Sequence, residues 1–420
     1  MGFRQLGLTR MLITLRWLWV AGLVFVTPID YGRVGLTNPD AVDTKKWIVL
    51  LPFWYLPLAL IIPRWPLVLN VFRRPPSSWL LAWSGLGAIS VLWAVDPKQA
   101  VLMGLAVATL VVVPTWQVFD RGWHSFATAV VAGLTANILL GVLWDLKDGL
   151  LFAGRPGGLT SGATTMARLG MLNIVLAAGL IWSKRGNWLL WPAAGLGVFV
   201  LALSETRTAI FATAVGLAYG GLRRISRQNR NLMIGVAVVG GLASLVLSAA
   251  FFAVGEQIER GNPTSISGRT DIWPVAVGQI LNRPILGHGM GSEEAVFIQA
   301  AFDGELDFLA GTTHSMYLSV WLSGGLIGFI LLATAMVSAW RRRRNVDPWV
   351  VAPLITVMIT GLTEAIVHIP TPSFLVMSGS IAAIAASDTN GIGHNGRNSP
   401  AKQSQPVTTN GWKDRFAIGS

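Results

Sequence analysis

The sequence of residues 99–119 is QAVLMGLAVATLVVVPTWQVF, and this run contains no charged side chain. A helix that crosses the hydrocarbon core of a bilayer needs roughly 20 predominantly apolar residues, so the run predicts a membrane-spanning helix. Comparable runs recur along the chain. We predict spans at residues 10–27, 47–62, 78–95, 99–119, 123–145, 167–183, 187–203, 207–221, 232–254, 315–337, 349–368 and 373–387. The pattern therefore predicts an all-α polytopic membrane protein with about 12 transmembrane helices.

The composition supports the same fold class. The chain has 420 residues, of which 53% are hydrophobic and 12% are charged. A soluble domain carries about 25% charged residues, so this chain has too few charges to cover a water-facing surface. The net charge of +12 does not indicate a nucleic-acid partner, because the basic residues gather in short loops between the apolar runs. The absence of cysteine excludes disulfides, thiolate metal ligands and cysteine nucleophiles.

The distribution of Lys and Arg predicts the orientation. If the N-terminus is cytoplasmic, one side carries about 20 basic and about 4 acidic residues, and the other carries about 11 basic and about 15 acidic residues. Basic loops stay in the cytoplasm, so both termini are predicted to be cytoplasmic. Residues 1–26 resemble a signal sequence, but no small-x-small cleavage site follows them, so we interpret them as a retained first helix.

We divide the chain into a transmembrane domain, residues 1–386, and a disordered cytoplasmic tail, residues 387–420. The tail is rich in Asn-Gly, Ser-Pro and Gln, a composition that cannot bury a core. The longest connection, residues 255–313, lies on the outer side. It contains Trp, Ile and Leu at helical spacing, which predicts short ordered helices within it.

Two arginines on the outer side mark a candidate anion site. Arg207 begins a predicted span, and Arg269 immediately precedes a predicted helix whose N-cap is Thr270. A cation at a helix N-terminus is disfavoured by roughly 0.3–1 kcal/mol, so two arginines in that position indicate an anionic ligand such as a phosphate.

The alternative interpretation of these arginines is structural. Arg207 would then pair with Glu205 or Glu364, and Arg269 would pair with Asp271.

His314 is the candidate base, because it stands where an outer loop meets a span. Imidazole titrates near neutral pH and can accept a proton from a sugar hydroxyl. The alternative is an interfacial histidine that is simply hydrogen-bonded. His288 competes for the role, since the glycines on either side of it would let a ligand approach closely.

The nearby acidic residues do not predict a metal site, because their spacing suits a solvated loop better. These residues are Glu293, Glu294, Asp303, Glu305 and Asp307.

Taken together, these segments resemble the O-antigen ligase and O-antigen or exopolysaccharide polymerase superfamily. The resemblance covers residues 155–380 well and the first half only as a pattern of spans. Four features in the family's order carry it: Arg207 opening a span, the Gly268-Arg269-x-x-x-Trp273 element, the Pro284-x-x-Gly287-x-Gly289 element, and His314 followed by Leu318, Gly325 and Gly328. The family usually has His-Asn where this chain has His314-Ser315. Residues 155–168 also resemble a family loop, which makes Arg155 and Arg168 secondary candidates beside His288 and Glu364.

The resemblance implies a metal-independent, inverting glycosyltransferase that needs no cofactor and acts on the periplasmic face of the bacterial inner membrane. Its donor would be a glycan on undecaprenyl diphosphate, and its acceptor would be lipid A–core or a growing polysaccharide. Arg207 and Arg269 would bind the diphosphate, and His314 would be the general base. Lipopolysaccharide or exopolysaccharide biosynthesis is the implied process, and the sequence leaves open whether the reaction is ligation or polymerisation.

Two other classes of protein remain as alternatives. A lipid-linked sugar flippase or polysaccharide transporter would place charges along a path inside the membrane. The predicted spans are almost free of charge, with Arg16 and Glu364 as the main exceptions. A non-catalytic assembly protein would tolerate alanine at the arginine and histidine positions.

Overall fold

A computed structural model describes residues 3–29, 65–148, 157–160, 162–183, 187–204, 206–226, 269–306, 311–366 and 371–397. Within these ranges the chain is all-helical, apart from one isolated bridge between Ile29 and Thr160. The predicted spans at 47–62 and 232–254 lie outside the described residues. The prediction of an all-α fold is confirmed for the part of the chain that the structure describes.

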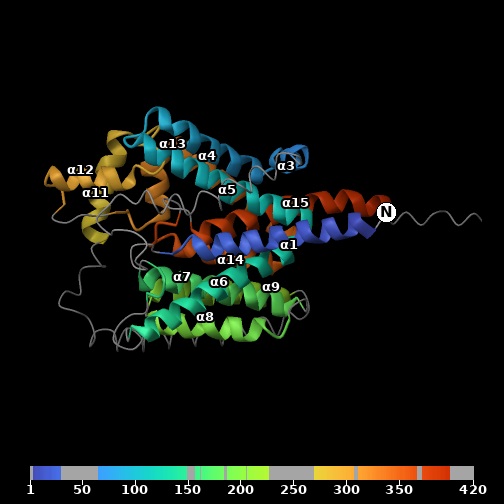
Figure 1. The fold of residues 1–420 in the computed structure, drawn as a ribbon. Helices are drawn as coiled ribbons and strands as arrows, with labels where there is room; N and C mark the ends of the chain where they lie inside the picture. The colour runs from blue at the N-terminus through green and yellow to red at the C-terminus, as the bar shows by residue number, and fades with distance from the viewer. Residues whose placement is uncertain are drawn as a thin grey trace, which may run out of the picture.

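Most described helix ends lie within about five residues of the predicted spans, and the larger differences are at the start of the first helix and at the ends of the last two. They are α1 (Phe3–Val26), α3 (Trp65–Phe72), α4 (Ser77–Ile89), η2 (Ser90–Leu92), α5 (Pro97–Arg121), α6 (Trp123–Lys147), α7 (Ala163–Trp182), α8 (Leu190–Ser204), α9 (Arg207–Ser226), α11 (Arg269–Asn282), α12 (Glu293–Phe302), α13 (Met316–Arg342), η3 (Arg343–Asn345), α14 (Pro348–Thr360) and α15 (Pro372–Arg397). Most of them run roughly along one direction, as Figure 1 shows.

Among the helices of the described residues, four are long and apolar enough to cross a bilayer: α5, α6, α7, and α13 together with η3. Shorter apolar helices add to them, at Thr14–Val26, Ser77–Leu92, Leu190–Ser204, Pro348–Thr360 and Pro372–Ser387. These lengths and compositions are those of a membrane protein. The total of about 12 spans remains a prediction.

Local sequence explains where several helices begin. The Asp96 side chain caps α5 by accepting from the Gln99 amide at 3.1 Å, and Pro97 occupies the first helical position. Asp347 caps α14 in the same way, again followed by a proline. These caps satisfy amide groups that a helix end leaves without a partner.

The two largest differences from the predictions are at the C-terminal ends of α14 and α15. The span predicted at 349–368 stops at Thr360, because the carbonyl of Gly361 accepts from the Met316 amide at 2.7 Å instead of continuing the helix. Glu364 therefore lies in a non-helical segment after α14 and not inside a span. At the C-terminus, α15 continues to Arg397, past the predicted start of the tail at residue 387. Residues 398–420 lie outside the described residues.

The other charge predicted inside a span, Arg16, is paired. Its guanidinium lies 2.6 Å from the Asp120 carboxylate and 4.2 Å from the centre of the Trp116 ring. These contacts join α1 to α5, so Arg16 has a structural role.

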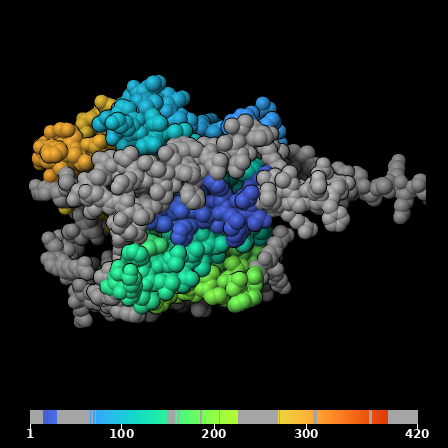
Figure 2. Space-filling view, in the orientation of Figure 1, coloured from blue at the N-terminus to red at the C-terminus, as the bar shows by residue number. Residues whose placement is uncertain are grey.

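The long outer connection is folded where it is described. Helices α11 and α12 lie together at one end of the molecule in Figure 1, and α12, in orange, projects there in Figure 2. A small apolar cluster packs α11 and α12 against the start of α13, and it includes Ile272, Ala276, Ile280, Phe297 and Leu322. Ile272, Ala276 and Ile280 of α11 are thus buried.

Helix α13 is interrupted at Gly325, whose φ is 62°. Residues 284–289 run against the interruption: Leu326 N donates to Pro284 O at 2.8 Å, and His288 N donates to Leu322 O at 2.8 Å. A side chain at Gly325 would place its Cβ 2.1 Å from the Ile285 carbonyl oxygen. The break is therefore satisfied by protein main chain, as non-helical backbone in a membrane protein requires.

Candidate active site

Arg269, the first residue of α11, pairs across the fold with Glu364. Its guanidinium lies 3.0 Å from a Glu364 carboxylate oxygen, and the two side chains are only 17% and 7% exposed. Asp271, the alternative partner suggested by the sequence, is exposed. The ion pair fastens the start of α11 to the segment of residues 361–366 that follows α14.

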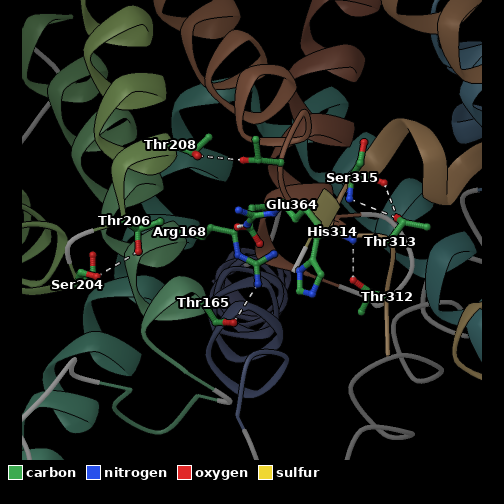
Figure 3. Close-up of polar contacts among 12 residues, drawn as sticks. Thr165, Arg168, Ser204, Thr206, Thr208, Thr312, Thr313, His314, Ser315 and Glu364 are labelled. Atoms are coloured by element: carbon green, nitrogen blue, oxygen red, sulfur yellow. Dashed lines mark hydrogen bonds and ion pairs between the residues drawn. The ribbon is translucent and has the colours of Figure 1, made fainter. Parts of the chain in front are cut away.

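A second arginine acts on the same carboxylate. Burial raises the pKa of Glu364, and the positive charges of Arg168 on α7 and of Arg269 oppose that rise. The Arg168 guanidinium also donates to Thr165 Oγ1 at 2.9 Å (Figure 3). Arg269 therefore forms the ion pair with Glu364, and the positive charge of Arg168 acts on the same carboxylate without an ion pair.

Both arginines keep an unused hydrogen-bond donor. The Nε atoms of Arg168 and Arg269 are buried and have no hydrogen-bond partner. A buried donor without a partner is costly, and it is more costly on a charged group. The excess positive charge and the open donors suit an anionic acceptor with several oxygens.

Arg207 begins α9, and its own side chain is exposed. The next residue, Thr208, accepts a hydrogen bond from Thr363 Oγ1 at 3.0 Å. Since Thr363 precedes Glu364, the first turn of α9 is bound to the same 361–366 segment. Glu205, one alternative partner of Arg207, lies outside the described residues.

His314 lies in the turn that leads into α13, and its backbone is unusual. Its φ of 50° makes it the one non-glycine residue with positive φ in the described part of the chain. Thr312 Oγ1 accepts from the His314 amide at 3.0 Å. The carbonyl of the preceding Thr313 accepts from the Trp273 indole of α11 at 2.9 Å. The turn is therefore held against the helix that carries Arg269.

The candidates converge on the 361–366 segment. The His314 turn contacts this segment through the hydrogen bond from Met316 to Gly361. The start of α9 contacts it through the hydrogen bond between Thr208 and Thr363, and Arg269 pairs directly with Glu364. In the view of Figure 3 the His314 imidazole and the Arg168 guanidinium extend into the same region, next to Glu364. Residues far apart in sequence thus contact one short segment: Arg269 through its side chain, and the His314 turn and the start of α9 through neighbouring residues.

The remaining secondary candidates do not join this site. Arg155 lies outside the described residues. His288 is buried, and its Nε2 lies 2.8 Å from the Gln279 carbonyl, which can only accept, so Nε2 carries the proton. Burial lowers the pKa of His288. A Cβ on the neighbouring Gly287 would lie 2.6 Å from Gly325 N, so this glycine admits the α13 backbone and not a ligand.

The acidic residues of the outer connection separate into two kinds. Glu294, Asp303 and Glu305 are exposed, as a solvated loop requires, and Asp307 lies outside the described residues. Glu293 is 1% exposed, so its assignment to a solvated loop is wrong. Among the described residues no three His, Asp or Glu side chains gather as metal ligands would.

The segment that carries most of the site matches a protein-family model. Residues 192–333 match the family model described as O-antigen ligase. Over this segment, about a third of its length, the chain is similar to the O-antigen ligase family. The matched segment runs from α8 into α13 and includes Arg207, Arg269 and His314, whereas Arg168 and Glu364 lie on either side of it. The O-antigen ligase match confirms the family resemblance found in the sequence and supports an enzyme of the ligase and polymerase class. No curated protein matches the chain.

Proposed function

We propose that the chain is an integral membrane glycosyltransferase that moves a glycan from undecaprenyl diphosphate to a sugar acceptor. The acceptor is lipid A–core or a growing polysaccharide. The observation that supports this most strongly is that Arg168 and Arg269 both act on the Glu364 carboxylate, with which Arg269 is paired, and that both keep buried Nε donors without partners. A diphosphate supplies the oxygens and the negative charge that this arrangement lacks.

In the proposed reaction the bond between the anomeric carbon and the diphosphate oxygen breaks, and the bonding electrons leave with the lipid diphosphate. Fixed guanidinium groups stabilise the charge that grows on the leaving oxygen. Arg207 adds a cation at the start of α9, where main-chain amides also favour an anion. Because cationic side chains meet the charge, we propose that no metal ion or cofactor is needed.

His314 is the proposed base. It accepts the proton of the acceptor hydroxyl as that oxygen bonds to the anomeric carbon, opposite the departing diphosphate, which gives inversion. Its turn contacts α11 through Thr313 and the 361–366 segment through Met316, so an acceptor at His314 would stand next to the cations. His288 is less suited, because it is buried between α11 and α13.

We propose that this site faces the periplasm at the inner membrane surface, with both termini in the cytoplasm. Exposed apolar side chains on α11 and on the residues that follow it support an interfacial position. Val277 and Leu281 of α11 are 45% and 69% exposed, and Ile285, which follows the helix, is 60% exposed. Apolar side chains on such a helix lie at the lipid boundary while its other face packs on protein. A flippase is not favoured, because within the described residues the charges of the candidate site lie near helix ends, and Arg16, the charge inside α1, is paired with Asp120.

The direct test is product formation by the purified protein. Detergent-solubilised protein with a lipid-linked glycan and an acceptor should form a new glycosidic bond and release undecaprenyl diphosphate, and a flippase would form none. Glycan analysis of a deletion strain then separates the two reactions. Shortened chains indicate a polymerase, whereas lipid-linked polymer that accumulates beside naked core indicates a ligase.

A further inference from the structure

Glu293, the first residue of α12, is a buried carboxylate whose two oxygens both bond to the neighbourhood of His314. One oxygen accepts from the Thr313 amide, and the other accepts from Ser319 Oγ at 2.6 Å. Thr313 precedes His314, and Ser319 lies in the first turn of α13. The carboxylate therefore bridges the two sides of the histidine turn.

This turn needs an external constraint. A residue with a side chain rarely adopts the left-handed conformation of His314, and it persists there only where surrounding contacts hold it. Thr312 Oγ1 accepts from His314 N, and Thr313 Oγ1 accepts from Ser315 N at 3.3 Å. These bonds are local, whereas the Trp273 indole ties the turn to α11 and Glu293 ties it to α12.

The charge of Glu293 also needs an explanation. Glu293 is 1% exposed, and no ion pair within the described residues involves it. Burying an ionised carboxylate is costly unless hydrogen bonds compensate for it. An apolar side chain would be enough for packing alone. The carboxylate is therefore explained by the two hydrogen bonds that it accepts, from Thr313 N and Ser319 Oγ.

We propose that Glu293 is a positioning residue that fixes the His314 turn and thereby aims the imidazole at the acceptor hydroxyl. The inference rests on the proposed function, because it takes His314 as the base. Within the described residues Glu293 bonds to Thr313 and Ser319 and not to Arg168, Arg269 or Glu364, so its loss should slow the chemical step and leave donor binding intact.

The experiment compares Glu293→Gln, Glu293→Ala and Ser319→Ala with wild type in the purified glycosyltransferase assay. Glu294→Gln is the matched control, because it removes an exposed carboxylate from the next position of the same helix. A misplacement of about 1 Å can cost 10²-fold in rate. We expect kcat to fall about 10-fold in Glu293→Gln, about 100-fold in Glu293→Ala and about 3-fold in Ser319→Ala, with the KM for the lipid-linked donor within about 2-fold of wild type.

Two results would overturn the inference. One is a wild-type kcat in both Glu293 variants. The other is a donor KM that rises as much as kcat falls, which would indicate a general loss of structure. If Glu293→Ala fails to reach the membrane, the near-isosteric Glu293→Gln decides the question. If the wild-type protein forms no product, the proposed function is wrong. This outcome differs from failure of the Glu293 inference, in which wild type and both Glu293 variants are equally active.

Discussion

Arg269 and Glu364 form an ion pair of 3.0 Å although they stand on opposite sides of α12 and α13 in the sequence. The pair locks α11 to the segment after α14, and Arg168 approaches the same carboxylate from α7. A carboxylate in that place keeps two guanidinium groups together in the absence of substrate. Because one carboxylate faces two guanidinium groups, Arg168, Arg269 and Glu364 together carry a net positive charge that an anion can neutralise.

Arg269→Ala should abolish product, with a loss of at least about 100-fold in kcat/KM, because it removes a cation from the leaving group. The same change leaves Glu364 buried without its partner, which is destabilising in its own right. The double variant Arg269→Ala/Glu364→Gln separates the two effects. It should recover the thermal stability of the purified protein and remain inactive, and recovery of activity would assign the pair a structural role only.

Glu364→Gln should strengthen the binding of inorganic pyrophosphate about 3- to 10-fold, because it removes a negative charge that acts on Arg168 and Arg269. Titration calorimetry of the purified protein at low ionic strength measures this directly, and added salt should reduce the difference. Weaker binding in this variant would mean that the carboxylate organises the arginines more than it opposes the anion.

His314→Ala should lower kcat about 10²- to 10⁴-fold, the range that a general base contributes, and leave donor binding unchanged. His288→Asn provides the comparison at the competing histidine and should retain most activity. If His314→Ala is fully active and His288→Asn is not, the base is His288.

The stability of the protein should fall as the pH drops from about 7 toward 5, in part because of His288. Burial lowers the pKa of His288 in the folded state below the ordinary value of about 6.5. At pH values between the lowered pKa of the folded state and about 6.5, the unfolded state binds more protons than the folded state. The free energy of unfolding therefore rises with pH through this window. The thermal midpoint of His288→Asn should be less sensitive to pH over that range, and an unchanged slope would contradict the prediction.

Activity should survive EDTA, because the proposed mechanism uses guanidinium groups where many glycosyltransferases use a divalent ion. The assay is initial rate after extensive chelation, with and without added Mg²⁺ or Mn²⁺. Strict recovery of activity by a divalent ion would require a different account of the leaving group.

Much of the fold could be predicted because membrane helices are set by local composition. The run at 99–119 and its counterparts required only enough apolar residues to cross a bilayer. The end of α14 could not be predicted in the same way. It depends on a hydrogen bond from Met316 to Gly361, which are distant in sequence, and the local residues continue to resemble a span.

The candidate site was predictable as a set of residues but not as an arrangement. Arg207, Arg269 and His314 were recognisable from their positions at element boundaries and from the family pattern. The partner of Arg269 was not, since Asp271 is near in sequence and Glu364 is near only in space. Glu293 was missed because an acidic residue among acidic neighbours resembles solvated surface. Only the fold reveals that its side chain is enclosed.

The interruption of α13 at Gly325 bears on how inactive variants should be interpreted. This residue has no part in the proposed chemistry, yet any larger residue there would collide with the 284–289 connection and displace α11 from α13. A genetic screen for loss of surface polysaccharide should therefore recover Gly325 alongside the arginines. The amount of protein inserted in the membrane distinguishes them, since the glycine variants should be depleted and the arginine variants abundant.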